Sequence, residues 1–308
     1  MEIKIPKPFE EKYKKLLSKE YEKLEACLFF KPKKSIRVNT IKISSEKLVK
    51  RLEKNGMKLK QIPWYKDGFF VENEKDVVKT LEYFLGYYYI QEASSMIPPL
   101  ILSPSPKDKV LDLCAAPGSK TTQIAMIMRN SGVIVANDNN LNRIKALRIN
   151  LQKMGVKNCI LTYEKGENFW KYGIKFDKVL VDAPCSGSGK IISTFSSLKL
   201  WSQSNVEKLS SLQKKLIYSA SKCLKEKGTL VYSTCSLDPE ENEEIIDFCV
   251  KNLGLSVEKI EIKNLKYREG ILEWNGKKFD ESIRNAIRIF PFENFTEGFF
   301  ICKLKKWA

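Results

Sequence analysis

The sequence contains no histidine, and this absence removes whole classes of chemistry. A Ser/His/Asp triad, a Cys/His dyad and a zinc or iron site with histidine ligands all need an imidazole. Cysteine or carboxylate side chains must therefore carry any acid–base chemistry. Without histidine, the net charge of the chain also changes little between about pH 5 and 8.

Long apolar runs and paired cysteine motifs are also missing. No apolar stretch approaches the roughly 18 residues that a membrane-spanning helix needs, and the first residues lack the apolar core of a signal peptide. None of the eight cysteines stands in a Cys-x-x-Cys pair, and a chain of 308 residues does not depend on disulfides. We expect a monomeric, cytoplasmic protein with free thiols, no bound metal and no membrane association.

Positive charge is what the sequence has in excess. Lys and Arg number 54 against 37 Asp and Glu, so the net charge is +17. Residues 1–60 alone hold 18 basic and 8 acidic residues. Lysines of this kind often form an ordinary solvated surface, but their concentration in one region favours a polyanionic partner such as nucleic acid.

Two regions follow from the pattern of apolar residues and turn residues. Residues 1–104 predict a small α+β RNA-binding module and a linker that ends in Ser-Pro-Ser-Pro. The elements expected there are a helix over 9–30, a strand over 35–40, a helix over 46–55 and a packing helix within 83–102. Residues 105–308 predict a second, larger domain.

In the second region, short apolar strands alternate with amphipathic helices. The expected strands are 110–114, 133–138, 159–163, 177–183 and 228–234, with helices that begin near Ser119, Leu141, Val206 and Glu240. This βα repeat predicts a mainly parallel, doubly wound, Rossmann-like sheet with helices on both faces. A last strand over 298–305 is expected to join the sheet as an antiparallel edge strand.

A turn after the first of these strands has the features of a cofactor site. The segment DLCAAPGSKT, residues 112–121, opens a helix at the carboxyl edge of the sheet, where doubly wound folds bind ligands. The next strand ends at Asp138, whose carboxylate can bind ribose hydroxyls. The turn lacks the full GxGxxG and the Walker lysine spacing. A nucleoside-bearing cofactor is the leading interpretation, and this geometry leaves both NAD and S-adenosylmethionine open.

Two cysteines follow later strands at the same edge. Cys185 lies in DAPCSGSG, residues 182–189, and Cys235 lies in STCS, residues 233–236. A lone cysteine at a strand end is usually a small buried apolar residue. Two such cysteines at neighbouring strand ends, each flanked by polar residues, point instead to catalysis.

The motifs DLCAAPGSKT, DAPCSGSG and YSTCSLDPEENE, with SIRVNTIK and IQEASSM before them, resemble one family in particular. This is the family of RNA cytosine-5 methyltransferases that includes the Nol/Nop/Sun-domain proteins and the bacterial 16S rRNA methyltransferases. The resemblance covers nearly the whole chain. It implies a class I methyltransferase fold and chooses S-adenosylmethionine over NAD.

The resemblance also implies roles for four residues. Cys235 would attack carbon 6 of cytosine, and Cys185 would assist release of the methylated product. Asp182 would bind the N3/N4 edge of the base and stabilise charge as the adduct forms. We expect Lys120 to favour the thiolate form of the nucleophile.

The cofactor-binding residues implied by the resemblance are Cys114, Ala115, Ala116, Pro117, Gly118, Ser119, Lys120, Asp138, Arg143, Glu164, Lys165 and Asp182. One position departs from the family pattern, because the third strand ends in Lys165-Gly166 where the family usually has Asp-Gly. Either Glu164 takes over the contact with adenine, or the backbone makes it alone.

The substrate is expected to be an unpaired or flipped-out cytosine, since a stacked base cannot reach such a site. The N-terminal region has no inserted domain and looks like that of archaeal tRNA cytosine-5 methyltransferases, so tRNA is favoured over rRNA. A non-catalytic ribosome-assembly factor is a third candidate, which the intact cysteines argue against. Protein or small-molecule methylation would not need two thiols.

Overall fold

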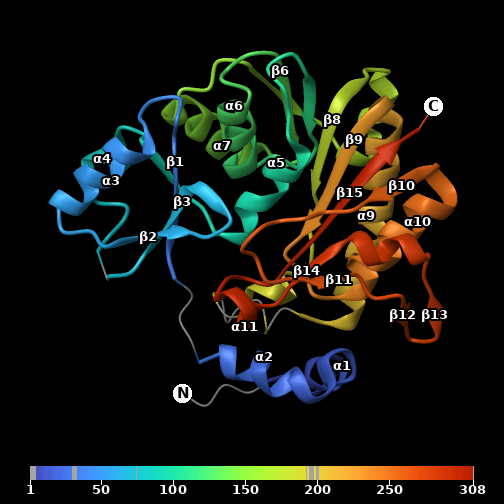
Figure 1. Ribbon diagram of the computed structural model, residues 1–308. Coiled ribbons are helices and arrows are strands. Elements are labelled where there is room, and N and C mark those ends of the chain that lie inside the picture. Colours follow the sequence, from blue (N-terminus) through green and yellow to red (C-terminus); the bar gives the residue numbers. More distant parts are fainter. Residues whose placement is uncertain are drawn as a thin grey trace.

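The structure is a computed structural model and describes residues 5–29, 33–73, 75–191, 193, 198 and 201–307. A large, mainly parallel sheet with helices on both faces forms its main part, and a small four-stranded sheet lies beside it (Figure 1). The predicted fold class is confirmed.

Five parallel strands build the centre of the large sheet in the order β7-β6-β5-β8-β9. They are β5 (Lys109–Asp112), β6 (Val133–Asp138), β7 (Cys159–Tyr163), β8 (Phe176–Asp182) and β9 (Leu224–Thr234). The helices between and after them are α6 (Ser119–Ile127), α7 (Leu141–Met154), α9 (Gln203–Cys223) and α10 (Glu243–Leu253). These elements match the predicted βα repeat.

The sheet continues beyond β9 with antiparallel strands. As predicted, β15 (Phe299–Lys306) runs antiparallel to β9, but it is not the edge strand that was expected. Its other side pairs with two short strands that the sequence did not reveal, β14 (Ile287–Ile289) and β10 (Leu255–Glu258). The strand β11 (Arg268–Glu269) pairs with β14, and β12 (Glu273–Trp274) with β13 (Lys277–Lys278) forms a separate hairpin.

Burial on both faces explains why the central strands are continuously apolar. In β8, Val179 and Val181 pack into one core cluster with Leu216 of α9. The residue between them, Leu180, packs on the opposite face with Ile97 of α5 (Ile97–Leu102). Strands that helices cover on both faces need apolar residues at successive positions. The same packing holds the strands together, so that their ends meet at the carboxyl edge of the sheet.

The small sheet holds β1 (Ser35–Val38), β2 (Leu59–Ile62), β3 (Tyr65–Val71) and β4 (Tyr88–Ile90), in the antiparallel order β2-β3-β1-β4. The helix α3 (Ser45–Lys54) packs Leu48 and Leu52 into its core.

The packing helix predicted within 83–102 is wrong. The short helix α4 (Leu81–Phe84) is followed by Gly86, which has a left-handed φ of 69°, and the chain then enters strand β4. A short turn, η2 (Ser94–Met96), leads from there into α5. The pairing of β4 with β1 and the full burial of Tyr88 outweigh the local helical pattern.

The first helical segment docks on the large domain and not on the small sheet. In place of one helix over 9–30, the chain forms α1 (Lys7–Leu17), η1 (Ser18–Glu20) and α2 (Tyr21–Cys27), and the end at residue 30 lies outside the described residues. Phe9 and Tyr13 pack in one core cluster with Trp201 and Phe290. The division of the chain at residue 104 stays a prediction, since contacts run across it.

Within the described part of the chain, no helix is long and apolar enough to cross a membrane. The same residues contain no group of three or more His, Cys, Asp or Glu side chains that could hold a metal ion.

A buried ion pair ties β14 to the start of α10. The guanidinium of Arg288 binds both carboxylate oxygens of Glu243, at 2.5 Å and 2.8 Å, and both side chains are at most 2% exposed. Replacing Arg288 with Met would leave a buried carboxylate without its cation. We expect the free energy of unfolding to fall by about 3–5 kcal/mol, measured by urea denaturation. Arg284→Met removes the exposed pair with Glu281 and should cost less than about 1 kcal/mol. Equal effects of the two changes would contradict the assignment.

Candidate active site

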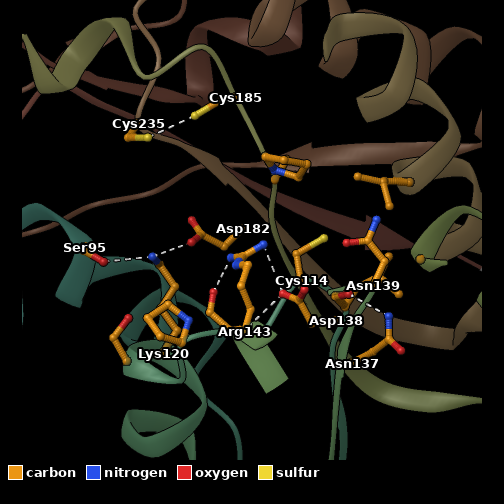
Figure 2. Close-up of a pocket in the computed structure, with 18 of the residues that line it drawn as sticks. Ser95, Cys114, Lys120, Asn137, Asp138, Asn139, Arg143, Asp182, Cys185 and Cys235 are labelled. Carbon is orange, nitrogen blue, oxygen red and sulfur yellow. Dashed lines mark hydrogen bonds and ion pairs between the residues drawn. The ribbon is translucent and has the colours of Figure 1, made fainter. Parts of the chain in front are cut away.

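A cavity of about 550 Å³ opens at the carboxyl edge of β5, β6, β8 and β9. Figure 2 shows side chains from all four strand ends that point into it. Its volume lies in the range of small-molecule sites. The predicted site residues that line it are Cys114, Ala116, Pro117, Ser119, Lys120, Asp138, Arg143, Asp182, Cys185 and Cys235.

The turn after β5 forms one wall of the cavity. Gly118 has a φ of 106° and stands just before α6, and a Cβ added there would come within 2.7 Å of Leu147 on α7. Only glycine therefore allows the two helices to approach so closely. Ala115 is held from behind by a hydrogen bond from its N–H to the carbonyl oxygen of Asn137. Ala115 and Gly118 thus shape the turn without lining the cavity.

Asp138 presents a carboxylate at the end of β6. Its oxygens accept hydrogen bonds from the backbone N–H groups of Ala116, at 3.2 Å, and Asn140, at 3.0 Å. Arg143 lies 3.3 Å from one oxygen and also donates to the carbonyl oxygen of Ala116. A carboxylate has about four acceptor positions, so two remain for vicinal hydroxyls. These donors and acceptors fit a ribose.

The segment after the third strand differs from the prediction at Glu164 and Lys165, and it leaves the alternative of a contact through the backbone alone. Glu164 and Lys165 do not line the cavity, whereas Gly166 and Glu167 do. The backbone of Glu164 is held by the side chain of Asn137, which donates to its carbonyl oxygen and accepts from its N–H. Because these two hydrogen bonds hold the backbone of Glu164 in place, the chain reaches the cavity only after residue 165. The missed signal was the polar Asn137 inside an otherwise apolar strand.

The two thiols meet at the opposite end of the cavity. The Sγ atoms of Cys185 and Cys235 lie 3.0 Å apart, within hydrogen-bonding distance, and point toward one another (Figure 2). Asp182 and Ser233 are paired residues in the parallel register of β8 and β9. Because of this register, the turns that follow the two strands lie side by side.

The surroundings of the two thiols give them opposite ionisation behaviour. The hydrogen bond from Cys185 lowers the pKa of Cys235, burial opposes this, and the nearby Lys190 ammonium supports it. The same hydrogen bond, together with burial, raises the pKa of Cys185. Cys235 is therefore the thiol that ionises first, and Cys185 keeps its proton.

Lys120 has a different partner from the one expected. Its Nζ lies 2.6 Å from Asp182 Oδ2 and donates to Ser95 Oγ at 2.8 Å. Ser233 donates to the other oxygen of Asp182 at 2.7 Å. Lys120 thus orients Asp182, and the expectation that it supplies the cation beside the thiolate is corrected.

The cation beside Cys235 is Lys190, which sequence reasoning missed. It lines the cavity and follows the DAPCSGSG motif directly. The N–H of Gly189 donates to the carbonyl oxygen of Cys235, and the N–H of Gly298 donates to Gly189, both at 2.9 Å. These bonds hold the turn at Gly189 against the end of β9. Lys190, the next residue, therefore lies close to the thiol of Cys235. The signal that could have identified Lys190 was its position directly after this motif.

The segment before α5 closes the remaining side of the cavity. Its lining residues are Tyr89, Ile90, Gln91, Glu92 and Ser95. Four of these five belong to the IQEASSM motif, which sequence reasoning used for the resemblance but not for the site.

Comparison with known proteins gives two family matches. Residues 99–305 match 16S rRNA methyltransferase RsmB/F, and residues 5–93 match the N-terminal domain of 16S rRNA methyltransferase RsmF.

The similar proteins include enzymes for two kinds of RNA. The chain is 43% identical over 305 residues to a tRNA (cytosine(49)-C(5))-methyltransferase of Pyrococcus abyssi. The matched region covers 98% of this chain and 97% of that protein. The chain is 42% identical over 281 residues to ribosomal RNA small subunit methyltransferase F of Vibrio campbellii, over 89% of this chain but only 57% of that protein. A solved structure, NSun6 from Pyrococcus horikoshii with SFG, is 26% identical and covers 98% of each chain with a TM-score of 0.86.

The difference between the two thiols can be measured directly. At pH 7, iodoacetamide should alkylate Cys235 faster than Cys185, because only a thiolate is a good nucleophile. Lys190→Met removes the cation, raises the pKa of Cys235 and should slow its alkylation severalfold, whereas Lys190→Arg should preserve the rate. Peptide mass spectrometry over a pH series gives both rates. The matched control is Lys107→Met, at an exposed lysine outside the cavity. An unchanged Cys235 profile in Lys190→Met would exclude the assigned role.

Proposed function

The chain belongs to the 16S rRNA methyltransferase RsmB/F family, and on this premise we propose that it methylates carbon 5 of a cytosine in RNA with S-adenosylmethionine. The family resemblance predicted from the motifs is confirmed. One observation carries the proposal: two thiols lie 3.0 Å apart, beside an ion-paired aspartate, in a cavity that extends to a second aspartate.

Asp138 and the turn after β5 are the groups that would hold S-adenosylmethionine. The ribose fit of Asp138 supports this, as does the similar structure determined with SFG, an analogue of S-adenosylmethionine. When bound, the cofactor supplies a methyl group on a positively charged sulfur. The cavity continues from Asp138 past Ala116 to Asp182 and the thiols, so one opening serves cofactor and base.

Cys235 is proposed to act as the nucleophile. Its thiolate forms a bond to C6 of cytosine, and the electron pair of the C5–C6 double bond moves to C5, which becomes enamine-like and accepts the methyl group. A water molecule then takes the C5 proton, the electron pair of that C–H bond restores the C5–C6 double bond, and the C6–S bond breaks with its electron pair leaving on the sulfur of Cys235. The protonated Cys185, 3.0 Å away, can share its proton with that leaving sulfur.

Asp182 is proposed to bind the polar edge of the base. Lys120 and Ser233 each occupy one of its oxygens and hold the carboxylate at the cavity wall. Each oxygen keeps a further acceptor position for an N–H of cytosine. Addition of the thiolate places negative charge on the ring, which is neutralised when N3 takes up a proton, and the fixed carboxylate favours this step by accepting a hydrogen bond from the protonated N3.

The substrate is proposed to be tRNA. The support is the similarity to a tRNA methyltransferase over nearly the whole of both chains, together with the basic N-terminal region. The second candidate is 16S rRNA, which the family description favours, although this chain spans only 57% of the rRNA enzyme of Vibrio campbellii. A monomeric state, a cytoplasmic location and the absence of a metal stay predictions.

Removal of the Asp138 carboxylate should weaken cofactor binding. Asp138→Ala is expected to cost about 1.5–3 kcal/mol of binding free energy for S-adenosylmethionine, the size of hydrogen bonds to a charged group. Isothermal titration calorimetry measures this. The matched control is Asp177→Ala, since that residue starts β8, at the other edge of the sheet, and pairs with Lys225. Equal affinities in both variants would remove Asp138 from the site.

The two cysteine variants should fail in opposite ways. Cys235→Ala cannot form the adduct and should be inactive, with no covalent complex. Cys185→Ala should form the adduct but release it slowly, so that a protein–RNA species survives denaturing gel electrophoresis in the presence of cofactor.

The gel is run with tRNA and 16S rRNA transcripts in parallel, which separates the two candidate substrates. If both cysteines are packing residues without catalytic roles, neither variant should form a covalent complex. A complex from Cys235→Ala alone would reverse the two roles.

A further inference from the structure

A buried ion pair joins the first helix of the chain to the turn after β9. Lys12 of α1 places its Nζ 2.6 Å from Asp238 Oδ1 and 2.9 Å from Glu240 Oε2. The Lys12 side chain is only 10% exposed and that of Asp238 is fully buried. Burial disfavours the charged form of Asp238, but the Lys12 ammonium outweighs it and lowers the pKa of that carboxyl. Asp238 is therefore a carboxylate that depends on a cation from another part of the chain.

The second oxygen of Asp238 contacts both of the turns that carry the thiols, which follow β8 and β9 and are called the catalytic turns below. Its Oδ2 accepts hydrogen bonds from Ser236 Oγ at 3.1 Å and from Trp201 Nε1 at 3.2 Å, and it lies 3.1 Å from Ser186 Oγ, whose single proton is directed to the closer carboxylate of Glu241. Ser186 directly follows Cys185, and Ser236 directly follows Cys235. One carboxylate thus holds the residue next to each thiol.

Further hydrogen bonds make this link stiff. The two serine Oγ atoms lie 3.3 Å apart, and Glu241 accepts from both the N–H and the hydroxyl of Ser186, at 2.9 Å and 2.5 Å. Ser188 contacts Ser236 Oγ at 3.1 Å and accepts from the N–H of Leu237. The positions of the two thiols therefore depend on one connected polar network, in which Lys12 supplies the cation for Asp238 and Glu240.

We propose that Lys12 is a positioning residue, through which helix α1 sets the spacing and orientation of the Cys185 and Cys235 thiols by way of Asp238 and the two serines. This rests on the proposed function in that the two thiols perform the reaction. The docking of α1 beneath the catalytic turns (Figure 1) gives it a task beyond carrying positive charge. The alternative is an ion pair that only stabilises the fold.

A double-mutant cycle separates these two roles. Lys12→Met and Asp238→Asn should each lower kcat for methylation of a tRNA transcript at least tenfold, with little change in KM for S-adenosylmethionine. If Lys12 acts only through Asp238, then Lys12→Met should add less than a twofold loss in the Asp238→Asn background. Lys12→Arg, which keeps the cation, should retain most of the activity. Lys14→Met is the matched control, because Lys14 lies on the same helix and pairs with Glu10 at the surface.

A second readout does not depend on RNA. Phenylarsine oxide bridges two thiols only when they lie close together, so its affinity for the Cys185 and Cys235 pair reports their spacing. We expect this affinity to fall at least tenfold in Lys12→Met and in Asp238→Asn, and to stay unchanged in Lys14→Met. Thermal unfolding of each variant shows whether the measured sample is folded.

Each outcome bears on the proposal. Wild-type kcat and arsenical affinity in folded Lys12→Met would overturn it. If Lys12→Met does not fold, Asp238→Asn decides, because it keeps the pair of Lys12 with Glu240, and wild-type values there would overturn the proposal equally. If the wild-type protein methylates no RNA, the proposed function fails, while the arsenical measurement still tests the positioning role.

Discussion

The register between β8 and β9 is the constraint on which the active site depends. Asp182 and Ser233 lie opposite each other in this parallel pair, so the turns that carry Cys185 and Cys235 leave the sheet side by side. A slip by one residue would move every side chain of a strand to the other face of the sheet. Alternate side chains of these strands are fitted into two different core clusters, so a slip would disrupt the packing on both faces, and core packing thereby sets the distance between the thiols.

Ion pairs with cations from other parts of the chain hold two carboxylates at the carboxyl edge of the sheet. Asp182, which is partly exposed, pairs with Lys120 from α6, and the buried Asp238 pairs with Lys12 from α1. A buried carboxylate without a cation is costly, so the second pair in particular fixes the segment that supplies its positive charge. Helices α6 and α1 are in this way tied to the ends of β8 and β9, although they lie far from them in the sequence.

Two chemically identical side chains acquire different roles from their surroundings alone. Cys235 accepts a hydrogen bond from its neighbour and faces Lys190, which favours its thiolate. The hydrogen bond with Cys235 and burial both raise the pKa of Cys185. The surroundings alone therefore favour ionisation of Cys235 over Cys185, which agrees with the roles proposed for the two thiols.

The sequence by itself predicted the parallel βα core, which the structure confirms, and it singled out the turn after β5, Asp138 and both cysteines, which the structure brings to one cavity. These features are local, because an apolar strand followed by small or polar residues can be recognised within about ten consecutive positions of the sequence. Only the tertiary structure decided that residues 88–90 form a strand, that α1 docks beneath the catalytic turns, and that Gly166 and Glu167 line the cavity in place of Glu164 and Lys165. It also decided that Lys190, and not Lys120, faces Cys235. Such outcomes depend on contacts between residues far apart in the chain, where packing and charge pairing outweigh local preference.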